Sequence, residues 1–220
     1  PEPSPPPPAT WTPAASPVPR PLWLPSLSSA ACLRGEGAAD VLLLLDSSSS
    51  MAESTRAGRS KVAAAADGIR ALAGILGADD RLGLLAFDAE VRLLAPLSAD
   101  PTELLAALAA LRLASGTRID HALSQAGELL SAVRDRPGSQ QAVILLTDGR
   151  VDEGAADDAV GAARVLRERG VLIRAIGLGS DVDLPLLTRL AGSREGVALT
   201  DDAEALAGLY LDAVRLLPCR

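Results

Sequence analysis

The chain has 220 residues, enough for one ordinary domain with a tail. Aromatic residues make up only 2% of the sequence, so we expect no surface built for stacking on bases or sugars. The 28 acidic residues outnumber the 21 basic ones, and the net charge of −7 argues against nucleic acid or anionic lipid as the main partner. No apolar run reaches the roughly 18 to 20 residues that cross a bilayer, so we expect no membrane insertion by this segment.

The N-terminal part of the chain is rich in proline. Eleven of the 16 prolines lie within residues 1–25, and proline lacks the backbone N–H that helices and central strands need. We therefore predict an extended, low-complexity linker over residues 1–31 and a folded domain over residues 32–220. We interpret Trp11 and Trp23 as isolated aromatic residues of the linker; the alternative is that they dock into a groove of a partner.

The first part of the folded region alternates between strand and helix patterns. Residues 40–46 hold five apolar residues between two aspartates, as in a strand that is buried on both faces. Residues 51–76 carry apolar residues at helical spacing, which predicts one long helix. Two strands follow at 81–87 and 90–95, and the tight Asp88–Ala89 turn between them makes the second an antiparallel edge strand.

The alternation continues to the end of the chain. The remaining strands are predicted at 141–147, 171–177 and 196–200. The remaining helices are predicted at 101–112, 118–133, 155–169, 183–191 and 203–217. Strands that alternate with amphipathic helices define an α/β fold class, with a mostly parallel sheet and helices on both faces. Ligands of such sheets bind beyond the carboxyl ends of the strands, so functional residues are expected where strands end.

Polar side chains collect at these strand ends. Asp46 closes the first strand and begins the motif Asp46-x-Ser48-x-Ser50; Asp148 follows the fourth strand, and Thr117 lies in a polar loop before the third helix. We expect the two carboxylates and three hydroxyls to meet at one edge of the sheet. Such an all-oxygen cluster suits a hard cation. Because hydroxyl ligands are neutral, the ion keeps an attraction for a further carboxylate from outside.

These motifs resemble the von Willebrand factor type A domain family. The order Asp46-x-Ser48-x-Ser50, then Thr117, then Asp148 within a Thr-Asp-Gly sequence is similar to the family's metal-ion-dependent adhesion site, or MIDAS. The resemblance covers the whole folded part and implies a Rossmann-like, doubly wound sheet of six strands. It also implies a bound Mg²⁺ or Mn²⁺, with Ser48, Ser50 and Thr117 as hydroxyl ligands. Asp46 and Asp148 would act directly or through water, and an open position would receive a partner's Asp or Glu.

Each piece of the motif also has a structural interpretation. Ser50-x-x-Glu53 can be a capping box for the following helix, and Thr117 can be an N-cap. Ser49 stands where many family members have glycine, which carries a modest cost if that position requires a positive φ. We interpret His121, the only histidine, as a solvated residue rather than a ligand, so no catalytic triad is expected.

Two cysteines flank the predicted domain. Members of the resembled family that are exposed outside cells sometimes close their ends with a disulfide, and domain termini often lie close together. We therefore expect a bridge between Cys32 and Cys219 and an extracellular, cell-surface or periplasmic location. The alternative is a pair of unbridged surface thiols in a reducing cytosol.

The resemblance implies a non-enzymatic module, which we expect to be part of a larger multidomain chain. The leading prediction is a metal-dependent adhesion module that binds an acidic residue of a protein partner. The first alternative is an intracellular relative that assembles with, or regulates, an ATPase complex. The second is a Mg²⁺-dependent phosphotransferase with Asp46 or Asp148 as nucleophile, for which the sequence shows no partner lysine or acid–base pattern.

Overall fold

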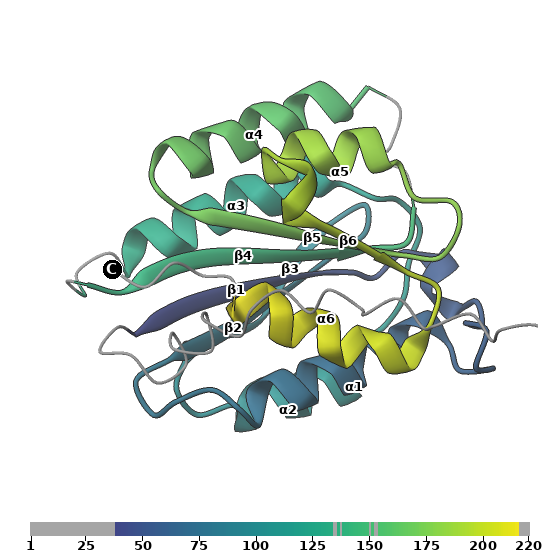
Figure 1. The fold of residues 1–220 in the computed structure, drawn as a ribbon, viewed down its shortest axis with the longest axis horizontal. Coiled ribbons are helices and arrows are strands. Elements are labelled where there is room, and N and C mark those ends of the chain that lie inside the picture. Colours follow the sequence, from purple (N-terminus) through teal and green to yellow (C-terminus); the bar gives the residue numbers. More distant parts are fainter. Residues whose placement is uncertain (1–37, 134–135, 137, 150, 152–153, 216–220) are drawn as a thin grey trace, which may run out of the picture.

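Six strands form a single sheet in the order β3-β2-β1-β4-β5-β6 (Figure 1). The computed structural model describes residues 38–133, 136, 138–149, 151 and 154–215. The strands are β1 (Ala39–Asp46), β2 (Arg81–Phe87), β3 (Val91–Ser98), β4 (Gln140–Thr147), β5 (Leu172–Leu178) and β6 (Val197–Thr200). Neighbouring strands pair in parallel except β2 and β3, which are antiparallel. The predicted α/β fold class, with its antiparallel edge strand, is confirmed.

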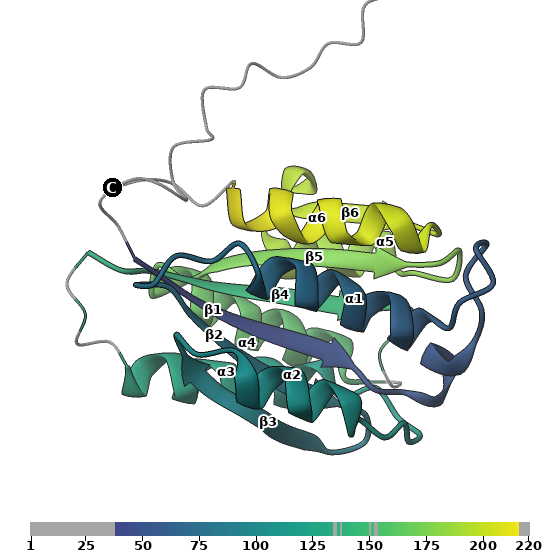
Figure 2. The same ribbon diagram turned by 90° about the horizontal axis from the view of Figure 1, so that it is seen from below.

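Helices cover both faces of the sheet. They are α1 (Lys61–Ala73), α2 (Thr102–Ala109), α3 (Ile119–Ala132), α4 (Ala156–Glu168), α5 (Leu184–Ala191) and α6 (Ala203–Arg215), with the short 3₁₀ helices η1 (Ser49–Ala52) and η2 (Arg194–Gly196). Helices α1, α2 and α6 lie on one face and α3, α4 and α5 on the other (Figures 1 and 2). Among the helices of the described ranges, none is both long and apolar enough to cross a membrane.

The central strands β1 and β4 are buried on both sides, which explains their uninterrupted apolar sequences. In β1, Val41, Leu43 and Leu45 pack with α1, α2 and α6, while Leu42 and Leu44 pack with the opposite helices. Alternate side chains of a strand point to opposite faces, so each central strand contributes side chains to the apolar core on both faces of the sheet. Each fully buried leucine or valine contributes about 1.5–3 kcal/mol relative to an exposed one.

Helices α1 and α6 pack very closely. A Cβ atom added to Gly68 of α1 would lie 2.7 Å from a ring carbon of Tyr210 of α6, so only glycine fits there. Tyr210 is fully buried in this contact, with 1% of its surface exposed. The last helix is thereby fixed to the first one (Figure 2).

The predicted helix over 51–76 is wrong in its first part, because α1 begins only at Lys61. Gly58 adopts a φ of +75°, a left-handed conformation that a right-handed helix cannot continue through. Ser60 is the N-cap of α1, and its side chain accepts a hydrogen bond from the backbone N–H of Ala63. The segment between η1 and α1 is therefore a loop, which places Lys61 at the start of a helix.

Some expectations lie outside the described residues. They are the proline-rich linker over 1–31, the domain boundary at residue 32, and the pairing of Cys32 with Cys219. These remain predictions.

A candidate metal centre at the ends of β1 and β4

Strands β1 and β4 are parallel neighbours, and their register pairs Leu45 with Leu146. The next residue of β1 is Asp46, whose carboxylate is fully buried. Its Oδ1 accepts a hydrogen bond from the backbone N–H of Ser48 at 2.8 Å, and its Oδ2 accepts one from Oγ1 of Thr147 at 2.6 Å. Both oxygens of Asp46 are thus oriented by its own loop and by the adjacent strand.

Hydrogen bonds link the serines of the motif to the second aspartate. The hydroxyl of Ser50 donates to Oδ1 of Asp148 at 2.8 Å, and the hydroxyls of Ser48 and Ser50 lie 3.0 Å apart. Asp148 is buried directly after β4, with 2% of its surface exposed. Four of the five residues predicted as metal ligands therefore belong to one hydrogen-bonded chain.

The fifth residue, Thr117, is carried by the loop between α2 and α3. This loop is fixed beside β1, because the backbone N–H of Ala114 donates to the carbonyl of Ser47 at 2.9 Å and Ala114 forms a β-bridge with Ser48. Gly116 has a φ of +98°, and a Cβ atom there would lie 2.8 Å from the backbone of Ala89. Thr117 follows this turn and is buried.

The two capping interpretations from the sequence are wrong. Ser60 caps α1, whereas Ser50 lies inside η1 and bonds to Asp148, so Ser50 and Glu53 form no capping box. Arg118, not Thr117, occupies the N-cap position of α3. Ser49 carries no left-handed strain, since no described non-glycine residue has a positive φ. The motif residues are thus not explained by helix capping.

One residue of this region, Lys61, was not predicted from the sequence. Its Nζ donates to Oδ2 of Asp148 at 2.6 Å and to Oε2 of Glu53 at 2.7 Å. Burial alone would lower the pKa of Lys61, but these two hydrogen bonds hold it above its ordinary value. The predicted long helix hid the residue by placing it mid-helix. The amino-acid composition of the chain was the one available signal, because Lys61 is the only lysine among 21 basic residues.

The electrostatics of the site favour a cation. Burial, and to a smaller extent the charge of Asp148, raise the pKa of Asp46 despite its hydrogen bonds from Ser48 and Thr147. Within the described part of the chain, no three His, Cys, Asp or Glu side chains are grouped to hold a metal. A metal here would depend on serine and threonine hydroxyls beside two carboxylates. This donor set fits a hard divalent cation.

A second polar network supports the site from the β2–β3 turn. Ser47, next to Asp46, donates its hydroxyl to Oδ2 of Asp88 at 2.9 Å, and Arg92 donates to the same oxygen at 2.5 Å. Burial would raise the pKa of Asp88, but hydrogen bonds from the Glu90 backbone, Ser47 and Arg92 hold it below its ordinary value. This network joins the end of β1 to the neighbouring turn.

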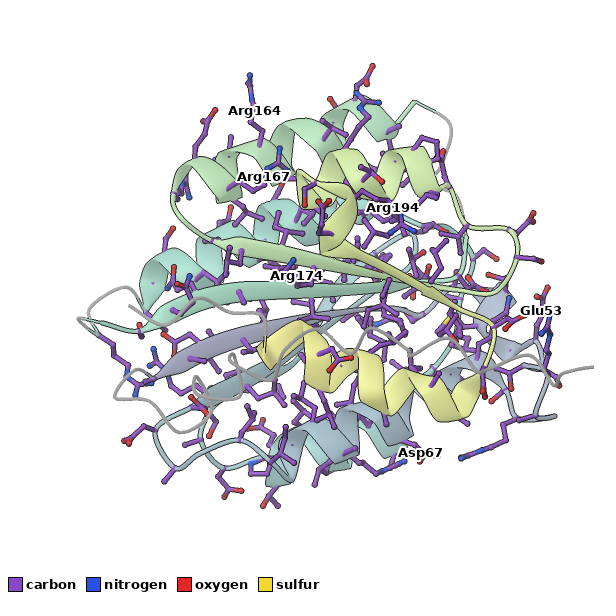
Figure 3. The ribbon with its side chains drawn as sticks, in the orientation of Figure 1. Glu53, Asp67, Arg164, Arg167, Arg174 and Arg194 are labelled. Carbon is purple, nitrogen blue, oxygen red and sulfur yellow. The ribbon has the colours of Figure 1, made fainter. Side chains whose placement is uncertain are left out.

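Beside the site lies a hollow of about 500 Å³. Glu53 and Lys61 line its side toward Asp148, and Figure 3 shows Glu53 at the end of the molecule where the parallel strands finish. The rest of its wall comes from the loop before α1, from the last residue of β5 and from the segments after β5 and β6, namely Ser54, Thr55, Arg56, Leu178, Gly179, Ser180, Asp181 and Asp201. A ligand at the candidate centre would therefore have polar space next to it.

The fold and the site together define a von Willebrand A-type sheet with polar loops at its carboxyl edge. The profile of the von Willebrand factor type A domain matches residues 40–210. The chain belongs to this family.

A curated relative and several solved structures are similar to the chain. The von Willebrand factor A domain-containing protein 2 of Xenopus laevis is 39% identical over 79 residues, which is 36% of this chain and 9% of that protein. The structure of proximal thread matrix protein 1 from the mussel byssus, with a zinc-occupied MIDAS motif, has a TM-score of 0.68 and 24% identity. The match covers 81% of this chain and 47% of the byssus protein's chain.

Bacterial structures show the same fold. A von Willebrand factor type A structure from Catenulispora acidiphila has a TM-score of 0.70 and 21% identity, covering 81% of this chain and 42% of that chain. The pilus adhesin SpaC from Lactobacillus rhamnosus GG has a TM-score of 0.66 and 19% identity, covering 81% of this chain and 30% of that one. The present chain thus spans 9% of its curated relative and less than half of these three structures.

Proposed function

We propose that this domain is a metal-dependent protein-binding module that takes an acidic residue of its partner. A Mg²⁺ or Mn²⁺ would be held by Asp46, Ser48, Ser50, Thr117 and Asp148. The observation that carries the proposal is the hydrogen-bonded chain from Asp46 through the two serines to Asp148, at the carboxyl edge of a von Willebrand A-type sheet. The zinc-occupied MIDAS motif of the byssus protein, a similar fold, supports a divalent metal at this place.

The charges of the site explain why a partner carboxylate would bind there. Asp46, Asp148 and Glu53 carry three negative charges against the one positive charge of Lys61, so the site attracts a divalent cation. The hydroxyl ligands are neutral and would leave the ion able to attract a further carboxylate. Bound there, the ion supplies a coordination position for one carboxylate. The chain's own residues orient the ligands: Thr147 and the Ser48 backbone hold Asp46.

We propose a binding rather than a catalytic role, because the carboxylate oxygens of both aspartates are buried and already hydrogen-bonded. Lys61 does supply the lysine beside Asp148 that the sequence did not reveal, but it forms an ion pair with that carboxylate. His121 is exposed on α3 and contacts Arg118, so it offers no acid or base to the site. Turnover of a phosphate ester that vanishes in Asp46→Ala would contradict the binding role.

We propose an extracellular, cell-surface or periplasmic location, within a longer multidomain chain. A byssus matrix protein and a pilus adhesin are among the proteins of similar fold, and both support a surface role. The Cys32–Cys219 bridge belongs to the same proposal. Intact mass under oxidising conditions tests it, because a bridge lowers the mass by about two daltons and removes both reactive thiols. Two alkylated cysteines in secreted protein would contradict it.

Binding of displayed peptides tests the proposed function. The immobilised domain is probed with a peptide library in Mn²⁺ and in chelator, and enriched peptides are resynthesised with Asn or Gln in place of their acidic residue. We expect binding that requires metal, the acidic residue and Thr117, so Thr117→Ala loses it. The matched control is Thr102→Ala, which removes an exposed hydroxyl bonded to Asp100 at the start of α2. Peptides that bind equally well in chelator would contradict the proposal.

A further inference from the structure

Lys61 places a positive charge on a predicted metal ligand. Its ammonium lies 2.6 Å from Oδ2 of Asp148, and its side chain is only 11% exposed. The other oxygen of Asp148 accepts the hydroxyl of Ser50. Oδ2 is therefore the oxygen of Asp148 that the ammonium neutralises, and a divalent cation near this carboxylate would be repelled by the same ammonium.

A second acceptor is already present for the lysine. Oε2 of Glu53 lies 2.7 Å from the ammonium, and the Glu53 side chain is 66% exposed. The lysine chain passes beside Gly179, where an added Cβ atom would be 3.5 Å from Cε of Lys61. Lys61 thus sits between a buried carboxylate in the site and an exposed one on the wall of the hollow.

We propose that Lys61 is a built-in competitor of the divalent cation: it neutralises Asp148 when no metal is bound, and metal binding displaces its ammonium from Asp148, so that Glu53 becomes its remaining partner. The inference rests on the proposed function and deepens it. It has two consequences. Lys61 lowers the metal affinity of the site while stabilising the metal-free domain, and metal loading brings a positive charge into the hollow beside the partner's carboxylate.

Metal affinity in a set of variants tests the competition. Calorimetry with Mg²⁺ and Mn²⁺ compares the wild type with Lys61→Met, which keeps the length of the chain without its charge, and Lys61→Arg, which keeps the charge. We expect Lys61→Met to bind the ion about tenfold more tightly, from the loss of one positive charge near it, and Lys61→Arg to stay near the wild type. The matched control is Arg164→Met, which removes an exposed charge on α4, on the opposite face of the sheet.

Substitution of Glu53 tests whether this residue accepts the displaced ammonium. If Glu53 is the acceptor that remains for the displaced ammonium, then Glu53→Gln should weaken metal binding several-fold when Lys61 is present. The same substitution should have a much smaller effect in the Lys61→Met background, because no ammonium needs the acceptor there. Equal effects of Glu53→Gln in both backgrounds would overturn the proposed movement.

Amine reactivity observes the lysine directly. Because the chain has one lysine, reductive methylation followed by mass spectrometry reports Lys61 alone, with the N-terminal amine as internal control. We expect the modification of Lys61 to become several-fold faster when Mg²⁺ is added, since its ammonium then loses its contact with the buried Asp148 and keeps only the exposed Glu53. Asp46→Ala should abolish this acceleration. An unchanged or slower reaction would overturn the proposal.

The experiments distinguish failure of the proposed metal binding from failure of the proposed role of Lys61. Absence of metal binding by the wild type contradicts the proposed function and this inference with it. A wild type that binds metal, with Lys61→Met binding no more tightly, contradicts only the role of Lys61. Circular dichroism in chelator checks that Lys61→Met is folded, and the reactivity of the wild-type lysine decides the matter should that variant not fold.

Discussion

Thr147 donates its hydroxyl to Oδ2 of Asp46 at 2.6 Å, although the two residues are 101 positions apart in the chain. The bond joins the last residue of β4 to the last residue of β1, and both residues are fully buried. A buried carboxylate that loses such a donor keeps the cost of its desolvation without the compensating bond. The threonine of the Thr-Asp-Gly sequence is therefore a support for the first aspartate of the motif.

Substitution of Thr147 tests this support. Thr147→Val keeps the shape of the side chain and removes the donor, so we expect the free energy of unfolding to fall by about 1–3 kcal/mol. Thr147→Ser retains the hydroxyl and should lose less. Urea denaturation of the three proteins in chelator measures the difference, and equal stability of the valine variant and the wild type would show that the bond contributes nothing.

Gly116 controls the loop that carries Thr117. Gly116→Ala meets both a left-handed conformation and the backbone of Ala89 at 2.8 Å, whereas Gly170→Ala meets a φ of +85° with nothing within 4 Å. The left-handed conformation costs each variant about 1–2 kcal/mol. We expect Gly116→Ala to lose more than the control in urea denaturation and also to bind Mn²⁺ more weakly. If the two variants lose the same stability and metal affinity, the contact with Ala89 does not position Thr117.

The network around Asp88 predicts an acid-sensitive part of the stability. Because the pKa of Asp88 is lower in the folded protein than in the unfolded chain, its contribution is complete above the unfolded value of about 3.9. That contribution is lost as the pH falls from there through the folded pKa. Asp88→Asn should destabilise the domain at pH 7 and flatten the decline of stability below about pH 4.

Urea midpoints of the wild type and Asp88→Asn between pH 7 and pH 3 measure this effect. Asp67→Asn is the matched control, since Asp67 pairs with Arg70 on the exposed side of α1. An acid decline of the same steepness in Asp88→Asn and the wild type would assign it to other carboxyl groups.

Removal of metal should leave the fold intact. The central strands β1 and β4 bury their apolar residues on both faces against the covering helices, unlike small domains that fold only around a metal. We expect chelation to leave the far-UV circular dichroism spectrum unchanged and to lower Tm only modestly, in proportion to the affinity for the ion. Loss of the helical signal in chelator would mean that the ion is part of the core.

The sheet was predictable because its signals are local. The apolar run of β1 ends at Asp46 and that of β4 at Thr147, so both strands and the polar residues after them can be read directly from the sequence. The short turn at Asp88–Ala89 indicated the antiparallel pair of β2 and β3 in the same way. Features that depend only on consecutive residues could therefore be predicted from the sequence.

The loop before α1 could not be predicted on the same basis. Its residues 53–60 hold only one apolar side chain, Ala57, and the predicted helix extended across them from the apolar spacing after residue 61. The actual helix start depends on the positive φ of Gly58 and on the cap at Ser60. The ion pair of Lys61 with Asp148 spans 87 positions and has no local pattern. The sequence placed the five oxygen residues at one edge, but the lysine that neutralises one of them becomes visible only in three dimensions.

The close contact of α6 with Gly68 gives the domain a natural optical reporter. Tyr210 is the only tyrosine of the chain and is fully buried against α1, and the two tryptophans lie in the N-terminal segment at positions 11 and 23. Burial raises the pKa of Tyr210, so phenolate formation is coupled to loss of this contact. The contribution of Tyr210 to the free energy of unfolding is fully present below the unfolded tyrosine pKa of about 10, and it is lost as the pH rises above that value. Phenolate absorbance in an alkaline titration would therefore record when the last helix separates from the first.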